Sequence, residues 1–177
     1  IETIKEACGA FGNPSSVHAL GREARRLIEQ ARHTIADFIG AEDGEIIFTS
    51  CGSEANNLAL RGLSCASASS DFHVITSAVE HPSVLQTCRC IEGLGWKVDY
   101  APVDEFGRVS PAEIEKMLRP ETRMISIMHA NNEVGTIQPI SEIAALAKKH
   151  NIPFHTDAVQ TFGKLPLNMS EIGVDYM

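Results

Sequence analysis

The chain has 177 residues, 44% of them hydrophobic and 6% aromatic, which is enough to bury a core and argues against an intrinsically disordered chain. With 23 acidic and 15 basic residues the formal net charge is -8, and the longest basic runs are the pairs Arg25-Arg26 and Lys148-Lys149, so nucleic acid is not an expected partner. No signal segment opens the sequence and no apolar run approaches the roughly 20 residues of a membrane span, so we expect a soluble protein that does not enter a membrane.

The cysteines are odd in number and unevenly spaced. They stand at Cys8, Cys51, Cys65, Cys88 and Cys90. This pattern fits a reducing compartment better than a disulfide framework, so the cytoplasm is the expected location.

Apolar residues recur at three- and four-residue steps from Ala19 to Ile39, and Gly40 follows, which predicts an amphipathic helix with a glycine stop. Short apolar runs then predict strands at Glu45–Thr49, His73–Ser77, Lys97–Tyr100, Met124–Met128 and Pro153–Thr156. Helical patterns lie between them at Glu54–Gly62, Pro82–Ile91, Pro111–Leu118 and Ile140–His150. The alternation predicts an α/β fold with a mostly parallel sheet and helices on both faces.

Two shorter segments complete this prediction. Residues 65–70, Cys-Ala-Ser-Ala-Ser-Ser, are of low complexity and are expected to form a surface loop. The final residues, Gly173 to Met177, resemble the approach to a further strand. No repeat or linker divides the chain, so a single domain is expected.

In open α/β sheets ligands bind beyond the carboxyl ends of the strands, so the residues after each predicted strand are candidates for a binding site. The segment Thr49 to Asn57 is a turn of small residues that leads into a helix, whose first N–H groups would suit a phosphate. The simpler alternative is an ordinary helix cap, with Ser50 or Ser53 capping and Glu54 favouring the helix dipole.

Two further strand ends carry polar side chains. His81, before Pro82, could stack on an aromatic ring or move a proton, or it could simply cap a helix. Asn131 and Asn132 could satisfy local backbone groups or bind a ring hydroxyl.

The last predicted strand ends at a carboxylate, Asp157, which suits a cationic nitrogen such as that of a protonated pyridine ring. The competing interpretation is a helix N-cap, since the residues from Ala158 onward could turn helical.

Hydrolase and metal chemistry are poorer fits. Ser50, His81 and Asp157 are the residue types of a catalytic triad, but no Gly-x-Ser-x-Gly elbow is present. The spacing of His150, His155 and Asp157 does not place three metal ligands on one face.

Five ordered motifs together resemble the cysteine desulfurase and selenocysteine lyase family, which is class V aminotransferase-like. They are Phe11 to His18, Thr49 to Asn57, Glu80-His81, Met128 to Gln138 and His155 to Lys164, and they cover nearly the whole chain. The resemblance implies the large domain of a fold-type-I pyridoxal 5'-phosphate enzyme that acts on L-cysteine.

The resemblance also implies roles for individual residues. Gly52 and Ser53 would contact the cofactor phosphate, His81 would stack on the ring, Asn132 and Gln160 would reach the ring hydroxyl, and Asp157 would pair with the pyridine nitrogen. His81 and Asp157 are the expected catalytic residues. No metal site is expected.

The chain departs from the family pattern at two positions in the phosphate turn. Cys51 stands where the family usually has glycine, and we expect its Cβ to restrict a positive φ and weaken cofactor binding. Ser53 replaces the usual threonine and keeps the hydroxyl.

The resemblance further implies that residues 1–177 form a single partial domain. The family's cofactor lysine lies in a Ser-x-His-Lys motif beyond Met177, Lys164 matches a different position, and the family's persulfide-forming cysteine and small domain also lie later. An N-terminal segment is expected to precede Ile1. The 177-residue chain alone is therefore expected to be inactive.

The expected function is that of a fragment of a cysteine desulfurase, which converts cysteine to alanine and passes sulfur through an enzyme persulfide toward iron-sulfur cluster or other sulfur-cofactor assembly. A homodimer and a sulfur-acceptor or scaffold protein are the partners that the family implies. The alternatives are a noncatalytic relative that acts as a binding or dimerisation module, or a selenocysteine lyase.

Overall fold

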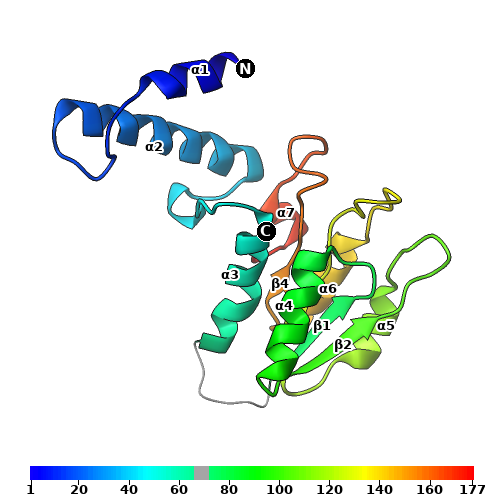
Figure 1. Cartoon of the computed structure of the whole chain (residues 1–177). Coiled ribbons are helices and arrows are strands. Elements are labelled where there is room, and N and C mark those ends of the chain that lie inside the picture. Colours follow the sequence, from blue (N-terminus) through cyan, green and yellow to red (C-terminus); the bar gives the residue numbers. More distant parts are fainter. Residues whose placement is uncertain (66–71) are drawn as a thin grey trace. The chain divides into compact units, whose positions relative to one another are not determined.

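The computed structural model describes residues 1–65 and 72–177, and the chain divides into two compact units (Figure 1). The first unit is Ile1–Phe48 and the second is Thr49–Met177. The expected surface loop at residues 65–70 lies largely outside the described residues.

The first unit is helical. It contains α1 (Glu2–Gly9), α2 (Ala19–Ile39) and the short 3-10 helix η1 (Asp43–Glu45). At the start of α2 the His18 Nδ1 accepts the Gly21 N–H at 3.2 Å, and at its end Gly40 adopts the left-handed φ of 68° that glycine tolerates. The predicted bounds of this helix are confirmed.

The strand predicted at Glu45–Thr49 is wrong. Glu45 ends η1, and in the described part of the chain no neighbouring strand pairs with the residues that follow. Ile47 and Phe48 are consequently 69% and 48% exposed, and the Arg32 guanidinium lies 5.0 Å from the Phe48 ring centre. A run of β-forming residues becomes a strand only where a partner supplies the ladder hydrogen bonds.

The second unit is built on a parallel sheet of four described strands in the order β2-β1-β3-β4. The strands are β1 (His73–Ser77), β2 (Lys97–Ala101), β3 (Thr122–Ser126) and β4 (Phe154–His155). All three strand pairings are parallel, so the carboxyl ends meet at one edge of the sheet. The predicted α/β fold is confirmed.

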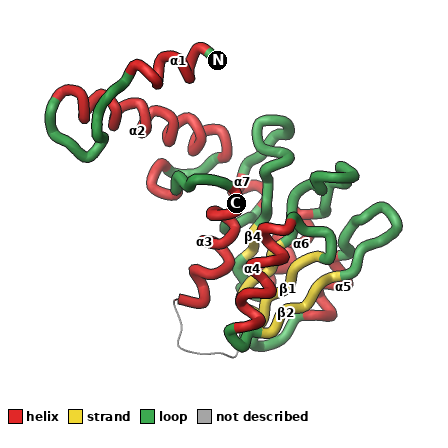
Figure 2. The backbone as a smooth tube through the Cα atoms, in the orientation of Figure 1, coloured by secondary structure: helices red, strands yellow, loops and turns green. Residues whose placement is uncertain are grey.

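Helices cover both faces of this sheet, as Figure 2 shows for α4 and α5. They are α3 (Gly52–Cys65), α4 (Pro82–Gly93), α5 (Pro111–Met117), α6 (Ile140–Lys149) and α7 (Met169–Ile172). Val74 and Met124 face α3 and α4 in one core, whereas their neighbours Ile75 and Ile125 face α5 and α6 in the other. Successive side chains along a strand point into opposite cores, so both faces of the sheet are buried. This explains why the strand sequences are nearly continuous apolar runs.

The boundaries of the later elements differ from prediction by a few residues. β3 begins two residues earlier than expected, because His73 pairs with Thr122 at its start. At the end of the chain Tyr176 forms a parallel bridge with His155, as the strand-like pattern of the last residues predicted. No helix within the described ranges is long and apolar enough to cross a membrane.

A matched pair of isoleucine truncations tests which residues form the core. Ile125→Ala, at a fully buried position of β3, should lower the free energy of unfolding by about 2–5 kcal/mol because it removes packed methyl groups and leaves a cavity. Ile137→Ala, at a side chain that is 53% exposed, should change it by less than about 0.5 kcal/mol. Urea unfolding of both variants measures the difference, and equal losses would contradict the assignment.

Candidate functional site

Hydrogen bonds join polar side chains from three segments at the carboxyl edge of the sheet. The Asn56 amide on α3 donates to Asp157 Oδ2 at 2.8 Å and to Ser83 Oγ on α4 at 2.9 Å. Ser83 Oγ in turn lies 2.8 Å from His81 Nδ1. Asp157 and His81, both selected from the sequence, therefore belong to one network.

Asp157 follows β4 and is 9% exposed. Its Oδ2 accepts from Asn56, and its Oδ1 accepts the Val159 N–H at 3.1 Å in a turn. Because the described backbone after Asp157 forms turns, the helix-cap interpretation does not hold at this position. The result is a nearly buried carboxylate that is held by its neighbours at the edge of the sheet.

His81 caps α4 and is exposed. Its Nδ1 accepts the Ser83 N–H at 3.2 Å, and since a backbone N–H can only donate, Nδ1 is the unprotonated nitrogen of the neutral ring. The ring proton then sits on Nε2. The capping role weighed for His81 is thus present, and it orients the ring.

The start of α3 combines a back-bonding glutamate with a close approach of two segments. Glu54 Oε2 accepts the Ser50 N–H at 2.6 Å, and a Cβ built on Gly52 would lie 3.3 Å from Val159 Cγ2. Glycine therefore lets the first turn of α3 lie close to the segment that follows Asp157. Ser53 lies inside the helix and is exposed, so it is not the cap.

Cys51 does not take the strained conformation expected of it. Among the described non-glycine residues a positive φ occurs at Asn151 and not at Cys51, so the expected backbone restriction is absent. The thiol is exposed, and its pKa is lowered by the backbone N–H of Glu54, the Ser50 hydroxyl and the backbone N–H of Ser53.

Asn132 and Gln160 stand apart from the network. The buried asparagine of the pair is Asn131, whose amide donates to the Val79 carbonyl at 3.0 Å, whereas Asn132 is exposed. Gln160 accepts a hydrogen bond from Lys164 Nζ at 3.3 Å. In the part of the chain that the structure describes, no hydrogen bond links Ser53, Asn132 or Gln160 to Asp157.

Two residues that connect the site were not predicted from the sequence. Asn56 lies one helical turn after Gly52, and Ser83 lies two residues after His81. A polar residue one turn into a helix that starts at a suspected site is a usable signal, because it shares the face of the helix start. Nothing in the spacing indicates that Asn56 meets a residue 101 positions later.

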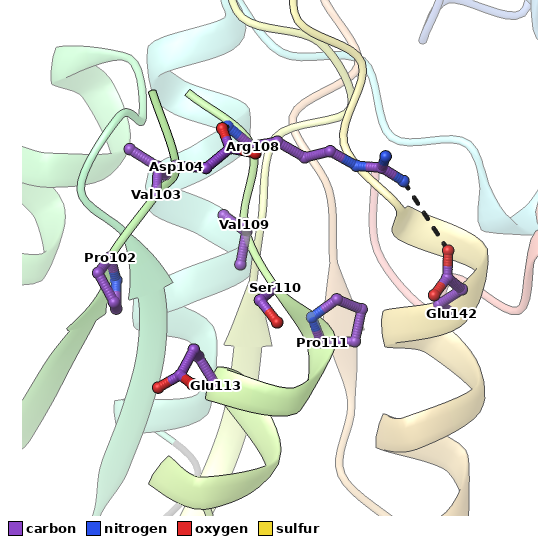
Figure 3. Close-up of a pocket in the computed structure, with 9 residues that line it drawn as sticks. All are labelled: Pro102, Val103, Asp104, Arg108, Val109, Ser110, Pro111, Glu113 and Glu142. Atoms are coloured by element: carbon purple, nitrogen blue, oxygen red, sulfur yellow. Dashed lines mark hydrogen bonds and ion pairs between the residues drawn. The ribbon is translucent and has the colours of Figure 1, made fainter. Parts of the chain in front are cut away.

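A hollow also lies between the loop after β2 and the start of α6 (Figure 3). Arg108 and Glu142 face each other across it at 3.9 Å. Asn56, His81, Ser83 and Asp157 do not line it, so it is separate from the network.

The Aminotransferase class-V family profile matches residues 2–177, so the chain belongs to that family. Among curated relatives, it is 54% identical over 167 residues to the cysteine desulfurase IscS of Dictyoglomus turgidum, covering 94% of this chain and 42% of the relative. It is 47% identical over 176 residues to the putative cysteine desulfurase IscS 1 of Bacillus subtilis, covering 99% of this chain and 46% of that protein.

Solved structures agree with this assignment. SspA in complex with cysteine matches with a TM-score of 0.95 at 41% identity, over 98% of this chain and 51% of its own. A NifS-like protein matches with a TM-score of 0.93 at 39% identity, over 98% of this chain and 49% of its own. The resemblance to cysteine desulfurases is confirmed, and the chain spans about half the length of the relatives that it matches.

The buried His155 should make stability depend on acid. Burial lowers the pKa of His155 to about 4, and Ser126 Oγ lies 2.8 Å from its Nδ1. The unfolded chain takes up a proton near pH 6.5 that the folded chain takes up only near pH 4, so this stabilisation is complete above pH 6.5 and is lost as pH falls to 4. The loss is about 3 kcal/mol.

His155→Gln removes this titration. In urea unfolding, the free energy of unfolding of the unmodified chain relative to that of the variant should therefore rise by about 3 kcal/mol as pH increases from 4 to 6.5. His33→Gln, at an exposed imidazole on α2, is the control and should not reproduce this rise. Parallel slopes for His155→Gln and the unmodified chain would contradict a neutral buried His155.

Cys51 should be the most reactive of the described exposed thiols. Because the thiolate is the nucleophile, its lowered pKa should make alkylation by iodoacetamide at pH 7.5 faster than at the exposed Cys8 and Cys90. Mass spectrometry of timed samples measures the three rates, and Cys51→Ser should remove the fast reaction. Similar rates at all three sites would show that the turn does not favour the thiolate.

Proposed function

We propose that this chain is the cofactor-binding part of a pyridoxal-phosphate-dependent cysteine desulfurase. The observation that carries the proposal is the Asp157–Asn56–Ser83–His81 network, which holds a buried carboxylate and an oriented imidazole at one edge of a parallel sheet. Relatives at up to 54% identity are named cysteine desulfurases, and a neighbour was solved with cysteine.

The residues at this edge fit pyridoxal 5'-phosphate in their chemistry. A pyridine nitrogen that is protonated needs a nearby anion, and Asp157 supplies a carboxylate that is kept in place by Asn56 and Val159. A phosphate needs N–H donors, and the first turn of α3 at Gly52 and Ser53 presents them. When bound, the cofactor supplies an electron sink for the substrate.

Each site residue then has a proposed task. Asp157 keeps the ring nitrogen protonated, and His81 offers a flat ring face with its proton on Nε2, away from the helix that it caps. Asn132 and Gln160 are proposed to reach the ring hydroxyl, since both lie on loops at this edge. To reach the ring hydroxyl, the Gln160 side chain must first break its hydrogen bond with Lys164 Nζ.

Partners and location follow at the same level of proposal. L-cysteine is the proposed substrate. The complete protein is proposed to be a homodimer that passes sulfur to an acceptor or scaffold protein for iron-sulfur cluster assembly. The odd number of cysteines favours the cytoplasm as its location. We also propose that residues 1–177 form one partial domain, and that a cofactor lysine in a Ser-x-His-Lys motif follows in the complete protein.

Replacing the ring partner tests the function. In the complete natural protein, Asp157→Asn should lower the rate of alanine formation from cysteine by roughly 100-fold or more, because a neutral amide does not stabilise a protonated ring nitrogen. Cofactor binding, followed by absorbance, should fall much less. Asp37→Asn, at an exposed aspartate on α2, should change neither.

The two ways in which this experiment can fail are distinct. A complete protein that binds no pyridoxal phosphate would refute the proposed function. A protein that binds it and keeps full turnover as Asp157→Asn would leave the function standing and show that the ring partner is misassigned.

A further inference from the structure

Glu80 lies in the turn between β1 and α4, directly before His81, and is 4% exposed. Its Oε1 accepts the Ser77 hydroxyl at 2.6 Å and the Met128 N–H, beyond the end of β3, at 2.9 Å. The amide of Asn131, in the loop after β3, adds a second tie to this turn at the Val79 carbonyl. The turn that carries His81 is thus attached to the neighbouring strand as well as to its own helix.

We propose that Glu80 is a positioning residue of the candidate site. It holds the turn that carries His81 against the segment after β3, and thereby fixes the position of the His81 ring relative to Asn56 and Asp157. The inference rests on the proposed function for the role of His81. It goes beyond that function because it assigns a task to a carboxyl that does not reach the exposed surface of the site.

The other oxygen of Glu80 indicates which form of the carboxyl performs this task. Oε2 is buried and has no hydrogen-bond partner among the described residues. An ionised oxygen in that position would lose its hydration without compensation, whereas the neutral acid loses far less. Burial accordingly raises the pKa of Glu80 to about 8, and the Asp157 charge adds to this, although the bonds from Ser77 and Met128 lower it.

The titratable groups that face Glu80 leave this conclusion unchanged. Asp157 lies after β4, His81 is the next residue, and Cys88 projects from α4. Burial raises the pKa of the Cys88 thiol to about 12, so it stays neutral while Glu80 titrates. While Glu80 is neutral it adds no charge beside Asp157. Once Glu80 ionises, a second buried negative charge opposes that of Asp157.

Nuclear magnetic resonance of the 177-residue chain tests this without cofactor or turnover. The Cε1–H resonance of His81, assigned with the His81→Gln variant, should show an inflection near pH 8 as Glu80 ionises. Glu80→Gln is isosteric and always neutral. Its His81 resonance should have the same chemical shift at pH 6 as in the unmodified chain and should show no inflection near pH 8. Glu105→Gln, which removes a charge from an exposed glutamate, should keep the inflection.

Stability provides a second readout with a defined sign. The unfolded chain loses the Glu80 proton near pH 4.5 and the folded chain near pH 8, so this stabilisation is complete below pH 4.5 and disappears as pH rises to 8. The urea midpoint of the unmodified chain, relative to that of Glu80→Gln, should therefore fall as pH rises from 5 to 8.

The outcomes separate this inference from the proposed function. The positioning role of Glu80 is refuted if the His81 resonance of the unmodified chain shows no inflection near pH 8, a result that does not depend on how well Glu80→Gln folds. It is also refuted if Glu80→Gln keeps the inflection. A displaced His81 resonance in Glu80→Gln at pH 6 would show that the ionised carboxylate is required, and would overturn the neutral form. Failure of cofactor binding leaves all of these results intact.

Discussion

The hydrogen bond from Asn56 to Asp157 is the contact on which the candidate site depends. It joins the first turns of α3 to the segment that follows β4, across 101 positions of sequence, at 2.8 Å. Because Asn56 also donates to Ser83, one amide fixes both the carboxylate and the start of α4, where His81 stands. A parallel sheet brings such distant segments together, since each crossover returns the chain to the same edge.

The two buried carboxyls at this edge differ because their partners differ. Each oxygen of Asp157 accepts a hydrogen bond, from Asn56 and from the Val159 N–H, so its charge is compensated. Glu80 places both of its hydrogen bonds on one oxygen and leaves the other without a partner. Compensation favours the ionised form at Asp157, and the lack of it favours the neutral form at Glu80. The edge can thus hold two acids with one negative charge.

Much of the fold follows from local pattern, and the failures have physical causes. The helix at Ala19–Ile39 and the strand at His73–Ser77 could be predicted to the residue, because glycine ends the first and two cores bury the second. The expected strand at Glu45–Thr49 fails since strand formation needs a partner, which no local pattern encodes. Of the site, Asp157 and His81 could be selected as polar residues at strand ends.

The connecting residues of the site escaped prediction for a different reason. Asn56 and Ser83 act through contacts between helices, and the depth of Glu80 depends on how α4 packs on the sheet. The conformation expected at Cys51 was wrong because its turn is made without a left-handed residue there. Residue type and spacing indicate where a site lies, whereas burial and partners decide what each residue does in it.

Glu80 and His155 also couple the edge to pH in opposite directions. His155 is neutral when folded, so acid below pH 6.5 favours unfolding, whereas Glu80 is protonated when folded, so base above pH 4.5 favours unfolding. Between pH 4.5 and 6.5 the unfolded chain holds one more proton than the folded chain at His155 and one fewer at Glu80. The two slopes cancel there, and the Glu80 slope alone remains from pH 6.5 to 8. A site that needs its buried acid neutral is thus most secure on the acidic side of pH 8, where the turn that carries His81 stays pinned to β3.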